Sequence, residues 1–111
     1  MKVVTLTDLP EEGVSHDPQL LKKVMIRGGE VPHVKQFARL WMAPGDVAHA
    51  HAHAAEYEIV FVESGEGIVR VNGRRIRIAE GTCVIFELRE THEITNPGPG
   101  DLVLIYFQVI A

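Results

Sequence analysis

One stretch of the chain decides its fold, namely residues 45–65, which read GDVAHAHAHAAEYEIVFVESG. Histidines alternate with alanines here, and a run of β-branched and aromatic residues follows. On a β-strand, residues two apart share one face, so His51 and His53 would project together with their α-carbons about 6.6 Å apart. On a helix, residues two apart diverge by about 200° and could not share one ion. A metal site on these histidines therefore requires a strand.

Two further residues can complete such a site. Glu58 follows His53 by five positions, and this odd offset would place it on the wrong face of one straight strand. A turn or bulge over residues 54–56 would let Glu58 face inward from the next strand. His92 can reach the same point from a later strand. We therefore expect one divalent metal ion on His51, His53, Glu58 and His92.

The chemistry of these donors limits the metal and leaves some roles open. Three neutral imidazoles and one carboxylate suit Fe, Mn, Ni, Zn, Cu or Co, and they leave one or two positions free for water, substrate or O₂. Glu58 is also the one candidate for a catalytic proton acceptor. Glu56 is the competing carboxylate, and His49 is an alternative ligand or a ligand-contacting group. His16 and His33 are expected at the surface.

The rest of the chain predicts an all-β protein. Asn72-Gly73 favours a type I′ hairpin, which needs positive φ at both residues. Asp17-Pro18 could open one short helical turn, with Asp17 as its cap. Short β-type runs recur at regular spacing, which favours a sandwich or barrel. We expect strands at residues 34–42, 57–62, 67–71, 74–78, 82–86, 92–95 and 102–110.

Length and composition indicate one domain with an ordinary core. The 111 residues are too few for two cores, so we expect an N-terminal arm or strand over residues 1–34 and a barrel over residues 35–111. The net charge of -4 disfavours a nucleic-acid partner. No apolar run approaches a membrane span, and no signal peptide is recognisable, so a cytoplasmic protein is expected. The single cysteine, Cys83, lies in an apolar run and is expected to be buried.

The spacing of the site residues resembles that of the cupin family. Residues 45–65 match the first cupin motif, G-x5-H-x-H-x(3,4)-E-x6-G, at every defined position. The second motif, G-x5-P-x-G-x2-H-x3-N, is matched at Gly81, His92 and Asn96. Glu87 stands where proline is usual and Arg89 where glycine is usual, which leaves the turn geometry before the histidine open. The resemblance covers about residues 35–110.

The resemblance implies a double-stranded β-helix, or jelly-roll barrel. It also implies that the residues aligned with the motif histidines and glutamate hold the metal inside the barrel mouth. Similar small proteins often form homodimers, in which an N-terminal strand packs on the sheet of the neighbour. Lys22–Ile26 or Val3–Leu6 could supply that strand here.

Three functions are compatible with such a site. The first is a dioxygenase or oxidase, in which a small organic substrate chelates the metal. The second is a metal-dependent isomerase, lyase or cyclase, in which the ion acts as a Lewis acid. The third is a non-catalytic module that binds or senses a small molecule. The fold alone does not choose among them, since one fold hosts many chemistries.

Overall fold

The computed structural model describes all residues from 1 to 111, and nearly all of its regular structure is β. A single turn of 3-10 helix at Leu6–Asp8 precedes the strands, and no helix has the length and apolar character needed to cross a membrane. The strands are β1 (Glu12–Val14), β2 (Asp17–Val31), β3 (Val34–Met42), β4 (Val47–His51), β5 (Glu56–Ser64), β6 (Glu66–Val71), β7 (Arg74–Ala79), β8 (Cys83–Phe86), β9 (His92–Thr95) and β10 (Leu102–Ile110).

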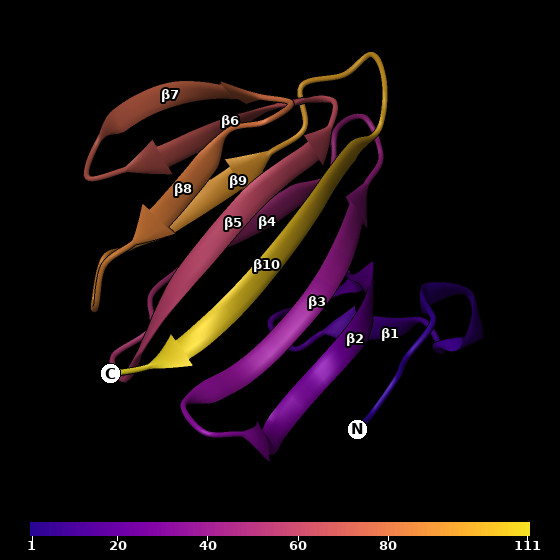
Figure 1. Cartoon of the computed structure of the whole chain (residues 1–111). Coiled ribbons are helices and arrows are strands. Elements are labelled where there is room, and N and C mark those ends of the chain that lie inside the picture. Colours follow the sequence, from indigo (N-terminus) through magenta and orange to yellow (C-terminus); the bar gives the residue numbers. More distant parts are fainter.

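The strands form two antiparallel sheets. The larger sheet has the order β1-β2-β3-β10-β5-β8, and the smaller has the order β4-β9-β6-β7. Figure 1 shows β10 between β3 and β5, although it follows both in the chain. Consecutive strands β3, β4 and β5 alternate between the sheets, as expected for a double-stranded β-helix. The predicted all-β barrel is therefore confirmed.

The core lies between the sheets, where inward-facing residues alternate with outward-facing ones. In β5, Glu58, Val60 and Val62 are buried, whereas Phe61 is 43% exposed. This is the alternation expected from the sequence. The inward faces of the neighbouring strands supply a dense apolar layer that includes Ala38, Leu40, Met42, Leu102 and Leu104.

Glycines of the two motifs occupy positions that other residues rarely adopt. Gly45, Gly65 and Gly81 have φ of 88°, 89° and 86°. At Gly65 a β-carbon would also lie 2.2 Å from the Asp101 carbonyl oxygen, so that position excludes any side chain. Asn72 and Gly73 both have positive φ, as the hairpin prediction required.

One expectation for the N-terminal segment is wrong. Asp17 does not cap a helical turn but begins β2, because its carboxylate accepts the backbone N–H of His49 at 2.8 Å. Within one chain, residues 3–5 lie outside the strands and Leu6 begins the 3-10 turn, so the pairing of Val3–Leu6 with a second copy stays a prediction. Residues Lys22–Ile26 lie within β2, which pairs with β3 of the same chain.

The outer face of the larger sheet is largely apolar, with Lys23 and the Arg39–Glu63 ion pair among its side chains, and it carries no further layer of this chain. In one cross-strand row, Phe37 and Ile59 flank Phe107, and Ile85 follows Ile59. Cys83 pairs with Phe61 on the same face and is exposed, so the prediction of a buried cysteine is wrong. The apolar run of β8 suggested burial on both sides, but only Val84 and Phe86 pack against the core.

Candidate metal centre

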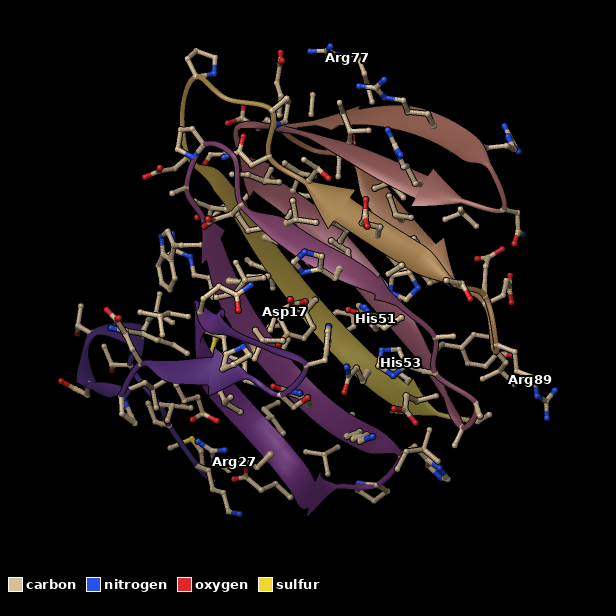
Figure 2. The ribbon with its side chains drawn as sticks, turned by 180° about the vertical axis from the view of Figure 1, so that it is seen from behind. Asp17, Arg27, His51, His53, Arg77 and Arg89 are labelled. Carbon is tan, nitrogen blue, oxygen red and sulfur yellow. The ribbon has the colours of Figure 1, made fainter.

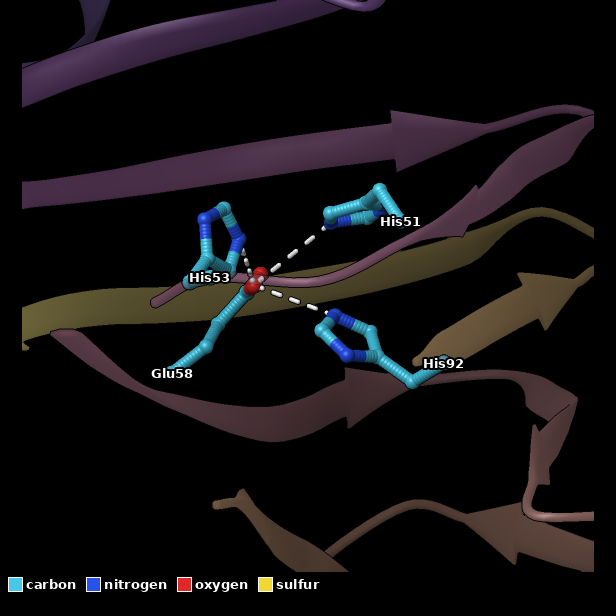
Figure 3. A group of neighbouring side chains, drawn as sticks. All are labelled: His51, His53, Glu58 and His92. Atoms are coloured by element: carbon cyan, nitrogen blue, oxygen red, sulfur yellow. Dashed lines mark hydrogen bonds and ion pairs between the residues drawn. The ribbon is translucent and has the colours of Figure 1, made fainter. Parts of the chain in front are cut away.

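Four side chains from three strands and one turn converge at the smaller sheet's edge. His51 ends β4, His92 begins β9 directly opposite it, and Glu58 faces inward from β5. His53 lies in the turn between β4 and β5. One ligand atom from each of the four residues lies within 4.8 Å of all the others. Figure 3 shows the three imidazoles around the Glu58 carboxylate.

The backbone reaches this arrangement differently from the sequence expectation. His51 and His53 were expected on one straight strand, but β4 ends at His51 and residues 52–55 form an irregular connection to β5. The bend at Ala54 and Ala55 was expected, and it brings Glu58 to the inward face of β5. Figure 2 shows His51 and His53 in the middle of the molecule, whereas Arg27 and Arg89 lie at its periphery.

Each imidazole is oriented by an acceptor on its Nδ1 atom. Nδ1 of His51 donates to the His49 carbonyl oxygen at 2.7 Å, and Nδ1 of His92 donates to the Glu90 carbonyl oxygen at 3.0 Å. Nδ1 of His53 lies 3.2 Å from Oε1 of Glu56. Since these oxygens accept, each Nδ1 carries a proton, and Nε2 is the ring nitrogen that each histidine directs at the cluster.

The Nε2 atoms all face one oxygen of Glu58. The distances to its Oε2 atom are 2.9 Å from His53, 3.2 Å from His92 and 3.7 Å from His51. Burial acts to raise the pKa of the Glu58 carboxyl, but its contacts with the three histidines outweigh burial and hold that pKa far below its usual range. Glu58 is therefore an anion.

These distances fit the donor set of a single ion. Two ligands that each lie about 2.1 Å from a metal are roughly 3.0 Å apart at a right angle and about 3.4 Å apart in a tetrahedron. The separations of 2.9, 3.2 and 3.7 Å bracket these values. The ring of His92 also stacks on Phe86, with centroids 3.8 Å apart, which fixes its plane.

The alternatives left open by the sequence have distinct places. His49 is turned away from the cluster, and its Nδ1 atom contacts Asp17 at 2.5 Å. Glu56 is buried but contacts the far side of the His53 ring, and its Oε1 atom also pairs with Lys35 at 2.7 Å. His16 is exposed, as expected, and its ring also lies 3.9 Å from that of His51, because the β1–β2 turn reaches across to β4.

Residues of the second motif hold the backbone around the cluster through hydrogen bonds. Arg89 occupies the usual glycine position with φ of 63°, a left-handed conformation, and its backbone N–H donates to the His53 carbonyl oxygen at 2.7 Å. Asn96 is 1% exposed, and its amide donates to the carbonyl oxygens of Met42 and Gly100. The turn therefore keeps the conformation that glycine would favour, despite the departure at Arg89.

A cavity of about 380 Å³ adjoins the cluster. His51, His53 and Glu58 line one side of it, and His16 lies beside them. Much of the remaining wall is apolar. The sequence did not identify the other polar residues of the cavity wall, although the inward parity of β2, β3 and β10 could have found them; they are Lys22, Gln36, Tyr106 and Gln108.

The fold and this centre are those of a cupin, and the chain belongs to that family. The family profile described as cupin domain matches residues 39–107. This range contains the whole first motif and the second motif through Asn96. Membership of the cupin family, expected from the two motifs, is thus confirmed.

Individual relatives agree with this assignment. The oxalate-binding protein of Thermotoga maritima is 36% identical over 66 residues, which are 60% of this chain and 54% of that protein. The match thus spans about half the length of that relative. A crystal structure of a predicted oxalate decarboxylase from Thermotoga maritima has a TM-score of 0.91 at 24% identity and covers 99% of this chain and 100% of that one. The Cnp3 cupin domain of Schizosaccharomyces pombe has a TM-score of 0.82 at 16% identity and covers 98% of this chain and 74% of that one. At these identities, the two structures show a shared fold.

Proposed function

We propose that this cupin holds one divalent metal ion on His51, His53, Glu58 and His92 and uses it to bind a small organic anion that chelates the ion. One observation carries the proposal. The Nε2 atoms of three histidines surround one carboxylate oxygen, at 2.9, 3.2 and 3.7 Å from Oε2 of Glu58. Such a group requires positive charge at its centre, supplied by a metal ion or by protons on the rings.

The residues of the site have separate tasks in this proposal. The ion supplies a Lewis acid that polarises the bound oxygen atoms of the ligand. The carbonyl oxygens of His49 and Glu90 and the carboxylate of Glu56 keep the rings in the tautomer that binds metal. The apolar side chains of Leu40, Val60 and Leu104 line the cavity and exclude water from the bound ligand.

The ligand class is supported by the chemistry of the cavity and by one relative. Oxygen donors of a carboxylate or an enol suit the metals that this donor set binds. The relative from Thermotoga maritima is described as an oxalate-binding protein, and oxalate is a chelating anion. We propose the wider class of chelating carboxylates for this chain.

Metal binding is tested by replacing two ligands. The double variant H51A/H53A should lose its divalent metal while the β-sheet fold persists, because both side chains line the cavity rather than fill the core. Elemental analysis and circular dichroism measure the two properties. His33→Asn is the matched control, since it removes an exposed histidine but suits the positive φ of 69° there. Stoichiometric metal in the double variant would refute the assignment.

A reaction with O₂, of the dioxygenase or oxidase type, remains our prediction for catalysis. Its test is oxygen uptake by the metal-loaded protein with catechol, diketone or thiol substrates. Turnover without oxygen would instead indicate an isomerase, lyase or cyclase. Tight binding of a carboxylate with no product in either condition would indicate a binding or sensing protein.

We also propose that the chain forms a homodimer through the outer face of the larger sheet. This face presents Phe61 at 43% and Ile85 at 59% exposure, beside the apolar row around Phe107. Contiguous apolar surfaces of this kind are typical of protein interfaces. A second copy of the chain would cover the face with an equivalent surface.

A further inference from the structure

Lys22 occupies a position in β2 that the core pattern reserves for an apolar residue. It lies between Leu20 and Val24 on the inward face, and these neighbours are 1% and 5% exposed. Lys22 itself is 9% exposed and lines the cavity beside the candidate metal centre. Lysine is rarely buried unless its charge is paired.

No carboxylate pairs with Lys22. Its Nζ atom donates to Oε1 of Gln36 at 2.7 Å, which is a neutral acceptor. Lys35, the other lysine of the cavity, has its charge matched by Glu56 at 2.7 Å. Burial lowers the pKa of Lys22, and the nearby charge of Glu12 only partly offsets this effect. A buried ammonium with a neutral partner is a costly arrangement that an anion in the cavity would relieve.

A strip of polar side chains connects Lys22 to the metal centre. Oε1 of Gln36 lies 3.4 Å from the Tyr106 hydroxyl, and Nε2 of Gln36 lies 3.4 Å from Oε1 of Gln108. Gln108 is opposite Glu58 in the pairing of β10 with β5. The strip offers hydrogen bonds to a polar ligand along one wall of the cavity.

Lys22 and Glu58 stand at opposite sides of the cavity floor. They lie on β2 and β5, which are separated by β3 and β10 in the sheet. Three strand spacings correspond to roughly 14 Å between the backbones of β2 and β5. The distance between the Lys22 ammonium and the Glu58 carboxylate is shorter, because both side chains extend into the cavity. The two carboxylates of oxalate share one carbon–carbon bond, so an oxalate on the metal cannot also reach Lys22. Cavities near 380 Å³ hold larger ligands than that.

We propose that Lys22 binds a second acidic group of the ligand, so that the ligand is an organic anion with a metal-chelating head and a carboxylate or other oxyanion several bonds away. This inference rests on the proposed function, since the metal must hold the head. Gln36 and Tyr106 lie beside Lys22 and complete the second anion subsite.

Two pairs of probes test the proposal in the wild-type protein loaded with Zn(II). Each pair shares a 2-oxo acid head and a chain length but differs in the remote carboxylate: 2-oxoglutarate against 2-oxopentanoate, and 2-oxoadipate against 2-oxohexanoate. Isothermal titration calorimetry gives the affinities. We expect at least one dicarboxylate to bind tenfold or more tightly than its matched monocarboxylate, because the added contact is charge-assisted. Equal affinities within both pairs would overturn the inference.

A matched pair of variants assigns the preference to one lysine. K22M should remove the difference within each probe pair and keep the metal, whereas K23M should preserve it, because Lys23 is outside the cavity and bonds to the Leu6 carbonyl oxygen. K22Q serves the same purpose if K22M does not fold. A dicarboxylate preference that survives in the folded Lys22 variant contradicts the role of this residue. Failure of all four probes to bind the metal-loaded protein would refute the proposed function itself.

Discussion

Glu56 links the metal centre to the cavity wall through a single carboxylate. It is 6% exposed, and its Oε1 atom lies 3.2 Å from Nδ1 of His53 and 2.7 Å from Nζ of Lys35. The Glu56 carboxylate thereby sets the tautomer of His53, and Lys35 balances the negative charge of Glu56. From the sequence, Glu56 was the alternative to Glu58 as the carboxylate ligand. The two residues lie two positions apart on β5, and Glu56 contacts Nδ1 of His53 whereas Glu58 contacts Nε2.

We predict that E56Q lowers metal affinity by about 10–100-fold, the usual effect of losing a group that orients a ligand. Competition with a chromophoric chelator measures the affinity. The control is E63Q, because Glu63 lies on the same strand but pairs with Arg39 away from the cavity. An unchanged affinity in E56Q would show that the Glu56 contact does not orient His53.

Arg89 permits a test of the departure from the second motif. Its left-handed backbone, with φ of 63°, costs most residues about 1–2 kcal/mol relative to glycine. We predict that R89G equals or exceeds the wild type in free energy of unfolding, whereas R89V loses about 1–2 kcal/mol because a β-branched residue fits this region worst. Urea denaturation compares the three proteins. The prediction fails if R89V is as stable as R89G.

Motif spacing predicted which side chains of the metal centre would meet, and the structure brings these atoms within 4.8 Å. Strand parity could have given Lys22 its inward direction, but the sequence could not place Lys22 across the cavity or His16 beside His51, because both come from the N-terminal segment outside the motifs. Their positions depend on how β2 pairs with β3 and how the β1–β2 turn meets β4. Such contacts are decided by tertiary packing rather than by local pattern.

At the scale of elements, the predicted strands from residue 34 onward match β3 and β5–β10 to within two residues at most ends. Clear alternation and turn residues made them recognisable. The N-terminal part was harder, since β2 opens with Asp17-Pro18 and contains buried Lys22, features that favour helix caps or surface positions. Its strand conformation is stabilised by pairing with β3 and by the contact of Asp17 with His49.

The turn between β5 and β6 supplies a prediction at this scale. Gly45 and Gly65 share nearly the same positive φ, but only at Gly65 would a β-carbon meet other atoms, the nearest 2.2 Å away in the backbone of Asp101. We predict that G45A loses about 1 kcal/mol of unfolding free energy, from backbone strain alone. G65A should lose more than about 3 kcal/mol, because the backbone must move as well. Chemical denaturation measures both, and equal losses would contradict the steric explanation.

At the scale of the whole molecule, the proposed homodimer predicts that charge on the outer face separates the subunits. The double variant F61K/I85K should be monomeric and still bind metal, because both side chains point away from the cavity. Analytical ultracentrifugation measures the mass. Ile76→Lys is the control, since Ile76 is 44% exposed but belongs to the smaller sheet. A double variant that stays dimeric would place the interface elsewhere, and a monomeric wild type would refute the dimer.

The place of β10 has a consequence for how the protein matures in the cell. β10 is the latest strand in the chain, yet it joins β3 to β5 in the middle of the larger sheet. While residues 102–110 are still inside the ribosome, the edges of β3 and β5 that later pair with β10 are unpaired. The part of the cavity wall that β10 supplies between Lys22 and Glu58 is also missing. The ligand cavity can be completed only after this segment is translated, since Leu104, Tyr106 and Gln108 of β10 line it, and the nascent chain is most exposed to aggregation just before β10 emerges.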